Sequence, residues 1–593
     1  MTEPEVRSLI SQIEAAVAGA IDRALPELAG ADPVVRRSEH ADFQSNAALA
    51  LAKQARTRPA ELATAISEAL RADSGTPVGE VTVSGPGFLN LAVADVAVWR
   101  QVAARLASPR LGIGTPEQGR RTVIDYSAPN IAKEMHVGHL RTTIIGDALA
   151  RLLSFLGAEV IRQNHLGDWG TQFGMLIQYL DEHPGATWHH DQLAEGTSTV
   201  SALDGLYRAA RAAFDADSAF ADRARARVVA LQAGDEATVA RWRDIVAESE
   251  FAFREMYDRL GVLLEPGDSA GESFYNAWLP DVVAELTAAG IAVESEGALV
   301  VYSREVTGPD GNPVTLMVRK KDGGYGYDTT DLATIRYRIR DLKADRLLYV
   351  VDSRQALHFR LIFEVARRAG WLTDDVDVTH VAFGTVLGPD GRPFKTRSGD
   401  VVKLMDLLDA AVDRARVTVA EKGPDLADDE LAQIAEQAGI GAVKYADLST
   451  SRTKDYVFDV DRMVSFTGNT GVYLQYAHTR ICSILRKAAD ASAGDASAEV
   501  DLMLPLHPAE RALALELDAF GDALTEVSRL LEPHRLCGQL YDLARAFTDF
   551  YEACPVLSAA PPLRANRLAL CHLAARTLRQ GLHLLGIAAP ERM

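Results

Sequence analysis

The chain has 593 residues, of which 48% are hydrophobic, and its formal net charge at pH 7 is -20. This length is several times that of a typical single domain, so we expect three or more domains with separate cores. The acidic start Met1–Glu5 lacks the basic-then-apolar order of a signal peptide, and no run of about 18 apolar residues occurs anywhere. We therefore exclude a secreted or membrane-spanning chain and predict a soluble, cytoplasmic one.

Cysteine content and net charge narrow the class further. Four cysteines, Cys482, Cys537, Cys554 and Cys571, lie in the last fifth of the chain without CxxC spacing. This pattern predicts neither a disulfide framework nor a thiolate zinc site, and it fits a reducing cytosol. The negative charge argues mildly against RNA binding, because phosphate contacts favour clusters of Lys and Arg. It also suits a small cationic substrate, although whole-chain charge cannot identify a ligand.

Residues 1–110 have the pattern of a small α/β domain. Helical periodicity runs through Glu5–Leu28 and Pro59–Leu70, and a strand-like stretch follows at Glu80–Ser84, closed by Gly-Pro-Gly. The basic, turn-prone segment Ser108–Arg121 then reads as a linker. We expect the next domain to begin near residue 115.

From Thr122 onward, short apolar runs alternate with longer amphipathic segments. The expected strands are Val123–Tyr126, Glu159–Gln163, Arg346–Asp352 and His380–Leu387, and the expected helices are Leu140–Leu156 and Leu357–Ala369. Strands that alternate with helices indicate βαβ units and a parallel sheet. We predict a Rossmann-type domain over 115–400, interrupted at about 181–300 by an insertion of polar helical sequence.

Strand signals nearly disappear after Asp400. The rest of the chain is Ala- and Leu-rich helical sequence, with breaks at Ala489–Val500 and Pro555–Pro562. We expect a helical segment over 401–462 and a separate helical domain over 463–593.

The most informative stretch is Ser127–Arg141, which contains His136-Val137-Gly138-His139 between a predicted strand and a predicted helix. Backbone N–H groups and the helix dipole favour phosphate at such a junction, and imidazoles can donate to phosphate oxygens. The glycine allows a flat base to approach the backbone. For a bare HxGH pattern, the alternative that the histidines only cap the helix is the stronger one.

A second, basic motif favours phosphate binding over simple helix capping for the histidines. Gly391–Asp400 is a glycine-bounded loop that contains Lys395, Thr396 and Arg397 and lies about 260 residues after the histidines. Its cations can hold a triphosphate and stabilise departing pyrophosphate. Alone, it would read as an ordinary solvated turn. Together, the two motifs have the layout that a class I aminoacyl-tRNA synthetase requires.

Longer segments carry a more specific resemblance. They are Ser127–Arg141, Gln163–Phe173, Tyr325–Arg338, Lys395–Gly399 and Leu585–Met593. The chain resembles arginyl-tRNA synthetases of the bacterial type nearly end to end, and the resemblance is weakest in the 181–300 insertion. It implies an arginine–tRNA ligase that converts arginine and ATP, with Mg²⁺ bound to the ATP, into arginyl-adenylate and pyrophosphate. The arginyl group then passes to the 3′-terminal ribose of tRNA(Arg).

The resemblance also implies roles for the motif residues. His136, Gly138, His139, Lys395, Thr396 and Arg397 would bind ATP, and His136, His139, Lys133, Lys395 and Arg397 would be catalytic. The loop usually written KMSKS appears here as Lys-Thr-Arg-Ser-Gly, without its second lysine. In this family the lysine upstream of the histidines is thought to supply the missing charge, which here is Lys133. The competing interpretation is a surface lysine at a helix entrance.

A guanidinium ion is a planar cation with five donors, so its pocket needs carboxylate and amide oxygens. The resemblance points to Ser127 and Asn130 at the α-amino and carboxylate end of arginine, and to Asp125, Tyr327, Asp331 and Gln355 around the rest of it. If Tyr327–Arg338 is helical, Tyr327 and Asp331 share a face. The alternatives are a helix N-cap for Asp331, a strand-end carboxylate for Asp125, a turn hydroxyl for Ser127 and a solvated side chain for Gln355.

By resemblance, the first domain binds the outer corner of the tRNA and the last domain binds the anticodon. The tRNA contacts would be Phe43, Gln44 and Asn46 in the first domain, and Tyr473, Gln475, Tyr476, Arg480, Tyr551 and Met593 in the last. Aromatic and cationic side chains at helical spacing suit base stacking and phosphate contact. For Phe43, Tyr473 and Tyr476, packing in a core is the alternative. We predict a monomer, no membrane partner and no metal held by protein side chains.

Three other functions compete with this one. A nucleotidylyltransferase would share HxGH but would not need the helical tail or the first domain. A synthetase-derived RNA-binding protein without catalysis would not need the intact histidines and lysines. A synthetase for another amino acid is the nearest rival, and the set Asp125, Asp331 and Gln355 argues against it.

Overall fold

The computed structural model describes residues 5–593 except 194–198, 395–401, 423–425 and 492–498. The chain divides into two compact units. The first consists of residues 1–116, 465–583 and 588–593, and the second of 117–464 and 584–587. No helix in the described part of the chain is long and apolar enough to cross a membrane.

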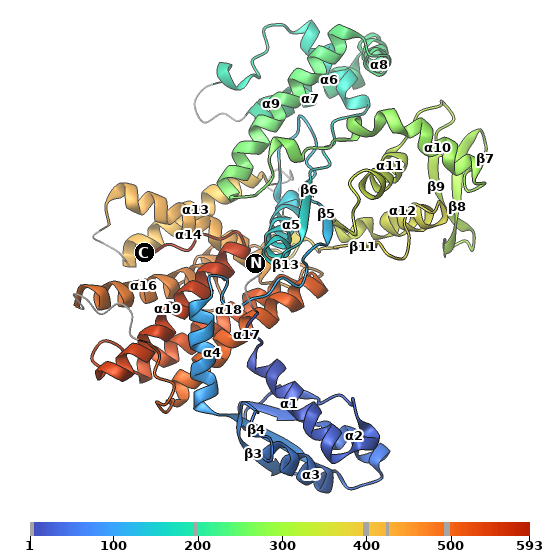
Figure 1. The fold of residues 1–593 in the computed structure, drawn as a ribbon. Helices are drawn as coiled ribbons and strands as arrows, with labels where there is room; N and C mark the ends of the chain where they lie inside the picture. The colour runs from blue at the N-terminus through green and yellow to red at the C-terminus, as the bar shows by residue number, and fades with distance from the viewer. Residues whose placement is uncertain (1–4, 194–198, 395–401, 423–425, 492–498) are drawn as a thin grey trace. The chain divides into compact units, whose positions relative to one another are not determined.

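The first unit begins with a small antiparallel sheet covered by helices (Figure 1, blue). Its elements are α1 (Leu9–Ala24), β1 (Val35–Arg37), β2 (Phe43–Ser45), α2 (Ala47–Ala55), α3 (Pro59–Arg71), β3 (Val78–Ser84), β4 (Phe88–Val93) and α4 (Asp95–Ala107). The strand order is β1-β2-β4-β3. The predicted helix over Glu5–Leu28 is shorter than expected, because the α-helix ends at Ala24 and a 3-10 turn at Pro26–Leu28 follows.

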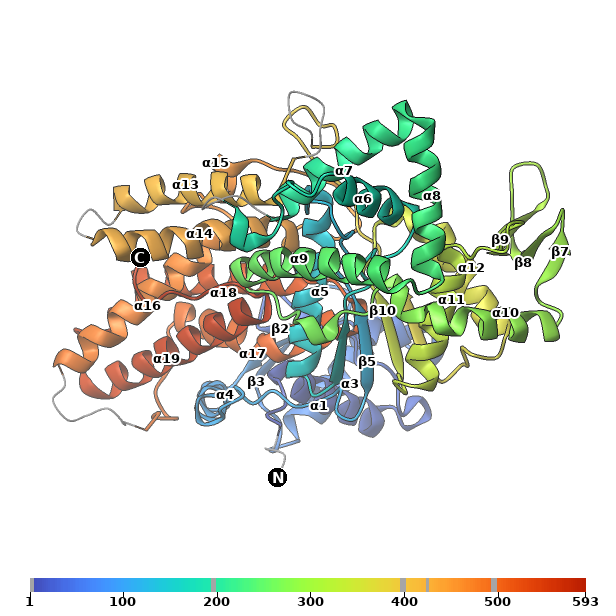
Figure 2. The same cartoon turned by 90° about the horizontal axis from the view of Figure 1, so that it is seen from above.

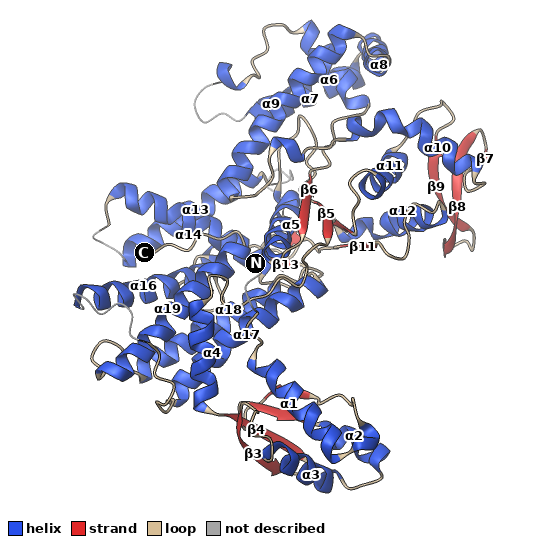
Figure 3. Ribbon diagram, viewed as in Figure 1, coloured by secondary structure: helices blue, strands red, loops and turns tan. Residues whose placement is uncertain are grey.

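The same unit contains the last four helices of the chain. They are α16 (Gly471–Ala491), α17 (Pro508–Leu530), α18 (His534–Ala553) and α19 (Pro561–Leu584). Figure 3 shows these helices in blue, joined by loops. These helices are joined to α4 through the buried carboxylate of Asp518 on α17. This carboxylate accepts hydrogen bonds from Arg105 and Gln101 of α4.

The second unit is organised around a four-stranded parallel sheet. Its strands are β5 (Arg121–Asp125), β6 (Glu159–Gln163), β10 (Arg346–Tyr349) and β11 (Asp377–His380), in the order β11-β10-β5-β6. From β5, the chain passes through α5 (Val137–Phe155) to β6 on one side, and later returns to β10 on the other. The carboxyl ends of β5 and β10 therefore form a topological switch point, where open α/β sheets bind ligands.

Between β6 and β10 lies a long excursion of helices and a small sheet. Its first part is α6 (Thr171–Glu182), α7 (Thr199–Ala216), α8 (Ser218–Gln232) and α9 (Glu236–Leu260), which pack on one another (Figure 2). It continues through α10 (Leu279–Ala288), β7 (Val293–Ser295), β8 (Ala298–Thr307), β9 (Pro313–Arg319) and α11 (Tyr327–Arg340). The helical character expected of this segment is present, although β7, β8 and β9 add strands to it.

The remaining elements of this unit follow β10. They are α12 (Ala356–Arg368), β12 (Val386–Leu387), α13 (Leu404–Lys422), α14 (Asp428–Leu448), β13 (Tyr456–Val457) and α15 (Val460–Met463). The prediction of one strand over His380–Leu387 is wrong. Strand β11 ends at His380, a bridge between Asp352 and Phe383 continues the contact, and β12 then pairs with β13 in a second sheet. The divergence occurs at Gly384, where an added Cβ would lie 2.8 Å from the backbone of Lys454.

Candidate active site

His136 and His139 close the first turn of α5. The Nδ1 atom of His136 accepts a hydrogen bond from the backbone of Gly138 at 3.0 Å, and the backbone N–H of His136 donates to Nδ1 of His139 at 3.1 Å. Gly138 is needed here because an added Cβ would lie 2.7 Å from the His136 ring. The capping role is therefore real.

The cap also determines which ring nitrogen can donate. An Nδ1 atom that accepts a hydrogen bond carries no proton, so a neutral ring carries its proton on Nε2. Burial lowers the pKa of His139 to about 3, with His136 adding to the effect. Burial, Arg354 and Lys133 lower the pKa of His136. Both rings are neutral at pH 7, and each has an Nε2–H donor that the cap does not use.

The loop from β5 to α5 contains three non-glycine residues with left-handed backbone conformations. Their φ angles are 74° at Ser127, 48° at Ala128 and 59° at Ala132. Each such residue costs roughly 1–3 kcal/mol unless its surroundings fix it, and such conformations cluster at functional sites. Hydrogen bonds supply the fixing here, since Ala128 N–H donates to Asn164 Oδ1 at 3.0 Å and Ser127 N–H to Thr142 Oγ1 at 3.1 Å.

Asn130 lies in the same loop and is exposed. Its backbone pairs with Gly167, because Gly167 N–H donates to Pro129 O and Ile131 N–H donates to Gly167 O, both at 3.1 Å. An added Cβ at Gly167 would lie 2.3 Å from Asn130 Oδ1, so any larger residue there would displace the Asn130 side chain. The Gln163–Phe173 segment thus packs directly on the loop that precedes the histidines.

Asp125 ends β5 at the switch point, and its carboxylate already has a cationic partner. Arg338 of α11 donates to Asp125 Oδ2 at 2.8 Å, and its side chain is 1% exposed. The Arg338 guanidinium also lies 5.0 Å from the centre of the Tyr349 ring. The strand-end interpretation of Asp125 fits this geometry, because the neighbouring arginine neutralises its charge.

Asp331 lies inside α11, which begins after the N-cap Gly326, so the N-cap alternative for Asp331 is excluded. His358 Nε2 donates to Asp331 Oδ2 at 2.6 Å, and His358 Nδ1 lies 3.2 Å from Asp328. Although burial alone would lower it, hydrogen bonds to Asp328 and Asp331 raise the pKa of His358 to about 9. His358 is therefore a cation at pH 7.

Tyr327 belongs to the same helix as Asp331, and Gln355 directly precedes the helix that carries His358. Tyr327 shares α11 with Asp331, as expected, and its ring lies 5.2 Å from that of His358. The ring of Tyr327 is largely exposed, as is Gln355, which directly precedes α12. The structure thus brings Tyr327 and Asp331 together beside His358, while Gln355 is the N-cap of the helix that carries His358 and Asp125 pairs with Arg338.

Sequence reasoning missed two further groups beside Asp331. His165 Nε2 lies 4.0 Å from Asp331 Oδ1. Burial raises the pKa of Glu272 to about 7, with Asp168 and Asp331 raising it and His165 lowering it. His165 is part of the Gln163–Phe173 segment that carries the family resemblance, so the sequence offered a signal for including it among the site residues. Glu272 follows a glycine in sequence without periodicity and left no signal to read.

Lys133 precedes the histidines, and its ammonium group lies 5.1 Å from the centre of the Tyr207 ring on α7. Lys395, Thr396 and Arg397 lie outside the described residues. The chain resumes against the histidine motif, because Val137 N–H donates to Val402 O at 3.1 Å. Lys403 then pairs with Glu134 at 2.8 Å. The segment that follows the basic loop is therefore anchored beside His136.

In the first unit, the residues expected to contact tRNA differ in exposure. Phe43 is 3% exposed and Gln44 is 5% exposed, and Gln44 Nε2 donates to Asn90 Oδ1 at 2.8 Å. Asn46 occupies the N-cap position of α2. For Phe43 the packing alternative fits best, and a base could stack on this ring only after a rearrangement.

The residues of α16 and α18 that are expected to contact tRNA include both exposed and buried side chains. Arg480 lies over the rings of Tyr476 and Tyr551, at 5.3 and 5.7 Å. Tyr551 is 43% exposed, so this stack reaches the surface. Tyr473 packs against Tyr541. Gln475 is fully buried and donates to Ala588 O at 2.9 Å, which holds the segment that ends in Met593.

The described residues contain no group of three or more His, Cys, Asp or Glu side chains arranged to hold a metal ion. What they do contain is a parallel sheet with a switch point, paired neutral histidines at a helix N-terminus, and the carboxylates of Asp328 and Asp331 around His358. Together with the separate helical domain, this combination defines the class of the protein as a class I aminoacyl-tRNA synthetase.

Comparison with known proteins gives the particular family. Residues 101–460 match the catalytic domain of class I (R) tRNA synthetases, 474–593 a DALR anticodon binding domain, and 9–93 an arginyl tRNA synthetase N terminal domain. The arginine–tRNA ligase of Frankia casuarinae is 82% identical over 593 residues, which is 100% of both chains. That of Streptomyces avermitilis is 52% identical over 99% of this chain and 100% of its own.

Solved structures agree. The arginyl-tRNA synthetase of Plasmodium falciparum matches with a TM-score of 0.82 at 27% identity, over 99% of this chain and all of that one. The Thermus thermophilus enzyme matches with a TM-score of 0.80 at 28% identity, over 98% and 100%. The chain belongs to the arginyl-tRNA synthetase family. The fold class and the ATP-dependent ligase activity expected from the sequence are thereby confirmed.

Proposed function

We propose that arginine is activated at the switch point, with its guanidinium group at the cluster formed by Asp331, Tyr327 and Gln355. The observation that carries this assignment is the cluster at Asp331, whose carboxylate lies 2.6 Å from His358 and 4.0 Å from His165 and acts electrostatically on the Glu272 carboxyl group. A guanidinium ion matches such a place in charge and in its number of donors. We add Glu272 to the residues expected to bind the substrate.

Ser127 and Asn130 are assigned to the α-amino and carboxylate end of arginine. Both belong to the loop that leads into the histidine motif, and Asn130 is exposed there. We retain Asp125 among the residues assigned to arginine binding. Its carboxylate acts through the Arg338 guanidinium group, to which it is hydrogen-bonded.

The nucleotide half of the site uses donors and cations. The arginine carboxylate attacks the α-phosphorus of ATP, and the bond to pyrophosphate breaks. Nε2–H groups of His136 and His139 donate to the phosphate oxygens as charge develops. Gly138 lets the nucleotide approach α5, and Lys395, Thr396 and Arg397 are assigned to the departing pyrophosphate. Lys133 supplies a further positive charge.

In the second step, a 3′-terminal ribose hydroxyl of tRNA(Arg) attacks the arginyl carbonyl and AMP leaves. Positioning is the main requirement of this step. We assign Asn46 and the stack of Tyr476, Arg480 and Tyr551 to tRNA contact, together with Tyr473 and Met593. Phe43, Gln44 and Gln475 are buried, so their contribution is to support neighbouring surfaces.

The proposal extends to the organisation of the chain. Residues 1–110 bind the outer corner of the tRNA, 115–400 form the catalytic domain, 401–462 contact a stem of the tRNA and 463–593 bind the anticodon. The enzyme works as a cytoplasmic monomer. Mg²⁺ would be held by the ATP phosphates, and we assign no step to it.

Asp331→Asn tests the arginine pocket. The change preserves side-chain size but removes the charge that would face the guanidinium group, so KM for arginine should rise at least about tenfold. ATP–pyrophosphate exchange is measured in the presence of tRNA, with Asp341→Asn at the exposed end of α11 as the control. An unchanged KM for arginine in Asp331→Asn would place the guanidinium group elsewhere.

Lys133→Ala tests the compensating charge. If Lys133 stabilises the leaving pyrophosphate, kcat of activation should fall about 100-fold, which is the scale of removing one well-aimed charge from a transition state. Activation near the wild-type rate would identify Lys133 as a surface lysine.

A further inference from the structure

Helix α9 reaches into the loop before the histidines at two of its left-handed residues. The Tyr257 hydroxyl lies 2.8 Å from Ser127 Oγ, and the Ser249 hydroxyl accepts a hydrogen bond from Ala132 N–H at 3.1 Å. Tyr257 and Ser249 are eight residues apart, which is about two turns, so they lie on one face of the helix. The insertion therefore contacts the loop where its backbone conformation is least favourable.

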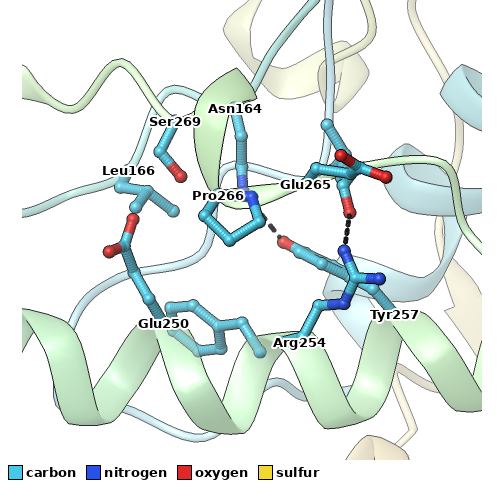
Figure 4. A pocket seen from close by; sticks show the side chains of 10 residues that line it. Asn164, Leu166, Glu250, Arg254, Tyr257, Glu265, Pro266 and Ser269 are labelled. Carbon is cyan, nitrogen blue, oxygen red and sulfur yellow. Dashed lines mark hydrogen bonds between the residues drawn. The ribbon is translucent and has the colours of Figure 1, made fainter.

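The Tyr257 hydroxyl forms the centre of a small network. Asn164 Nδ2 donates to it at 3.1 Å, and Asn164 Oδ1 accepts from the backbone of Ala128. Figure 4 shows the Tyr257 hydroxyl pointing to Asn164 at the edge of a small pocket. Thr143 donates to Ser127 Oγ at 3.0 Å and completes the surroundings of that hydroxyl. One phenol group thus holds both Ser127 and the residue that fixes Ala128.

Helix α9 is itself held firmly at this end. Arg259 pairs with Asp409 at 2.6 Å and with Glu436 at 2.8 Å, on α13 and α14. The buried Lys444 of α14 donates to Leu260 O at 2.7 Å. Because the end of α9 is tied to these helices, the position of the Tyr257 hydroxyl is determined by the unit as a whole.

We propose that Tyr257 is a positioning residue for arginine activation, through which the insertion holds Ser127 and the following amides in the orientation that the substrate needs. This inference rests on the assignment of Ser127 and Asn130 to the arginine carboxylate end. It gives the otherwise unassigned helix α9 a role in catalysis without contact between Tyr257 and either substrate.

Tyr257→Phe removes the hydroxyl and retains the buried ring. We expect KM for arginine to rise about tenfold in ATP–pyrophosphate exchange, while KM for ATP stays within about twofold. A role in packing alone would leave both values unchanged, and general damage to the unit would change both. Tyr126→Phe is the matched control, because the Tyr126 hydroxyl is buried without a hydrogen-bond partner among the described residues.

A double-mutant cycle tests whether Tyr257 acts through Ser127. The combination Tyr257→Phe with Ser127→Ala should cost less than the sum of the two single changes, because both changes remove the hydrogen bond between these two hydroxyls. Ser249→Ala, at the second contact, should give a smaller rise in KM for arginine. Additive losses in the cycle, or a Tyr257→Phe enzyme within twofold of wild type, would overturn the proposal.

These outcomes separate the two proposals. If Ser127→Ala leaves KM for arginine unchanged, the assignment of Ser127 to the substrate fails, and the positioning role of Tyr257 fails with it. If Ser127→Ala raises that KM and Tyr257→Phe does not, only the positioning role is refuted.

Discussion

His358 is held between two carboxylates of α11, and its charge is one of the clearest consequences of the site geometry. Its side chain is 14% exposed, and hydrogen bonds to Asp328 and Asp331 raise its pKa to about 9 despite burial. The imidazolium keeps the Asp331 carboxylate in one orientation. An arginine guanidinium that approaches Asp331 therefore meets a carboxylate whose position is already determined.

The raised pKa of His358 predicts a pH-dependent contribution to stability. A folded pKa above the unfolded value of about 6.5 means that the contribution is complete below pH 6.5 and is lost as the pH rises through about 9. His358→Gln should therefore cost about 2 kcal/mol at pH 7 and much less at pH 10. Thermal unfolding midpoints of both proteins at the two pH values provide the measurement. An equal difference at pH 7 and pH 10 would show that His358 is not charged in the folded enzyme.

At the scale of elements, the approach of α5 to the sheet depends on one glycine. Gly146 lies in the middle of α5, and an added Cβ would lie 2.3 Å from the Tyr126 side chain. The close approach brings the N-terminus of α5, with its two histidines, to the carboxyl end of β5. Helix packing and the geometry of the nucleotide turn are thus linked through this contact.

Gly146→Ala should destabilise the second unit by roughly 1–3 kcal/mol, because a methyl group has no space between α5 and Tyr126. The matched control is Gly205→Ala in α7, where an added Cβ meets nothing within 4 Å. That change should stabilise the protein by about 0.5–1 kcal/mol, since alanine is the better helix former. Chemical denaturation of both variants gives the comparison, and a Gly146→Ala protein as stable as Gly205→Ala would contradict the packing argument.

At the scale of the whole molecule, the two ends of the chain build one compact unit. Asp518 of α17 accepts hydrogen bonds from Arg105 of α4 at 2.8 Å and from the backbone of Leu9 at 2.6 Å. The side chains of Arg105 and Asp518 are only 4% and 5% exposed. A buried ion pair of this kind joins segments that are more than four hundred residues apart.

Asp518→Ala leaves the Arg105 guanidinium buried without its counterion and should cost about 3–5 kcal/mol. Glu526→Ala is the control, because the pair of Glu526 with Arg535 is 44% and 39% exposed and such pairs contribute at most about 1 kcal/mol. Urea unfolding followed by circular dichroism distinguishes the two. Similar losses in the two variants would show that the Asp518 network does not hold the unit together.

Local sequence patterns predicted much of this architecture. Glu159–Gln163 is a strand with the expected bounds, the helix predicted at Pro59–Leu70 extends one residue further, and the helix predicted at Leu357–Ala369 begins and ends one residue earlier. The longer segments around the histidine motif, together with Gln163–Phe173, Tyr325–Arg338, Lys395–Gly399 and Leu585–Met593, were enough to indicate the family. Periodicity and turn residues report on backbone conformation over a few residues, and that information is present in any short window of the chain.

Long-range partners needed the tertiary structure. The sequence alone determined that His136 and His139 begin a helix after a strand, and that Asp331 shares a helical face with Tyr327. Only the folded chain showed that Arg338 neutralises Asp125 from 213 residues away, and that Tyr257 meets Ser127 across 130 residues. It also split the run His380–Leu387 between two sheets at Gly384. Such contacts depend on where distant segments pack, and no local pattern carries that information.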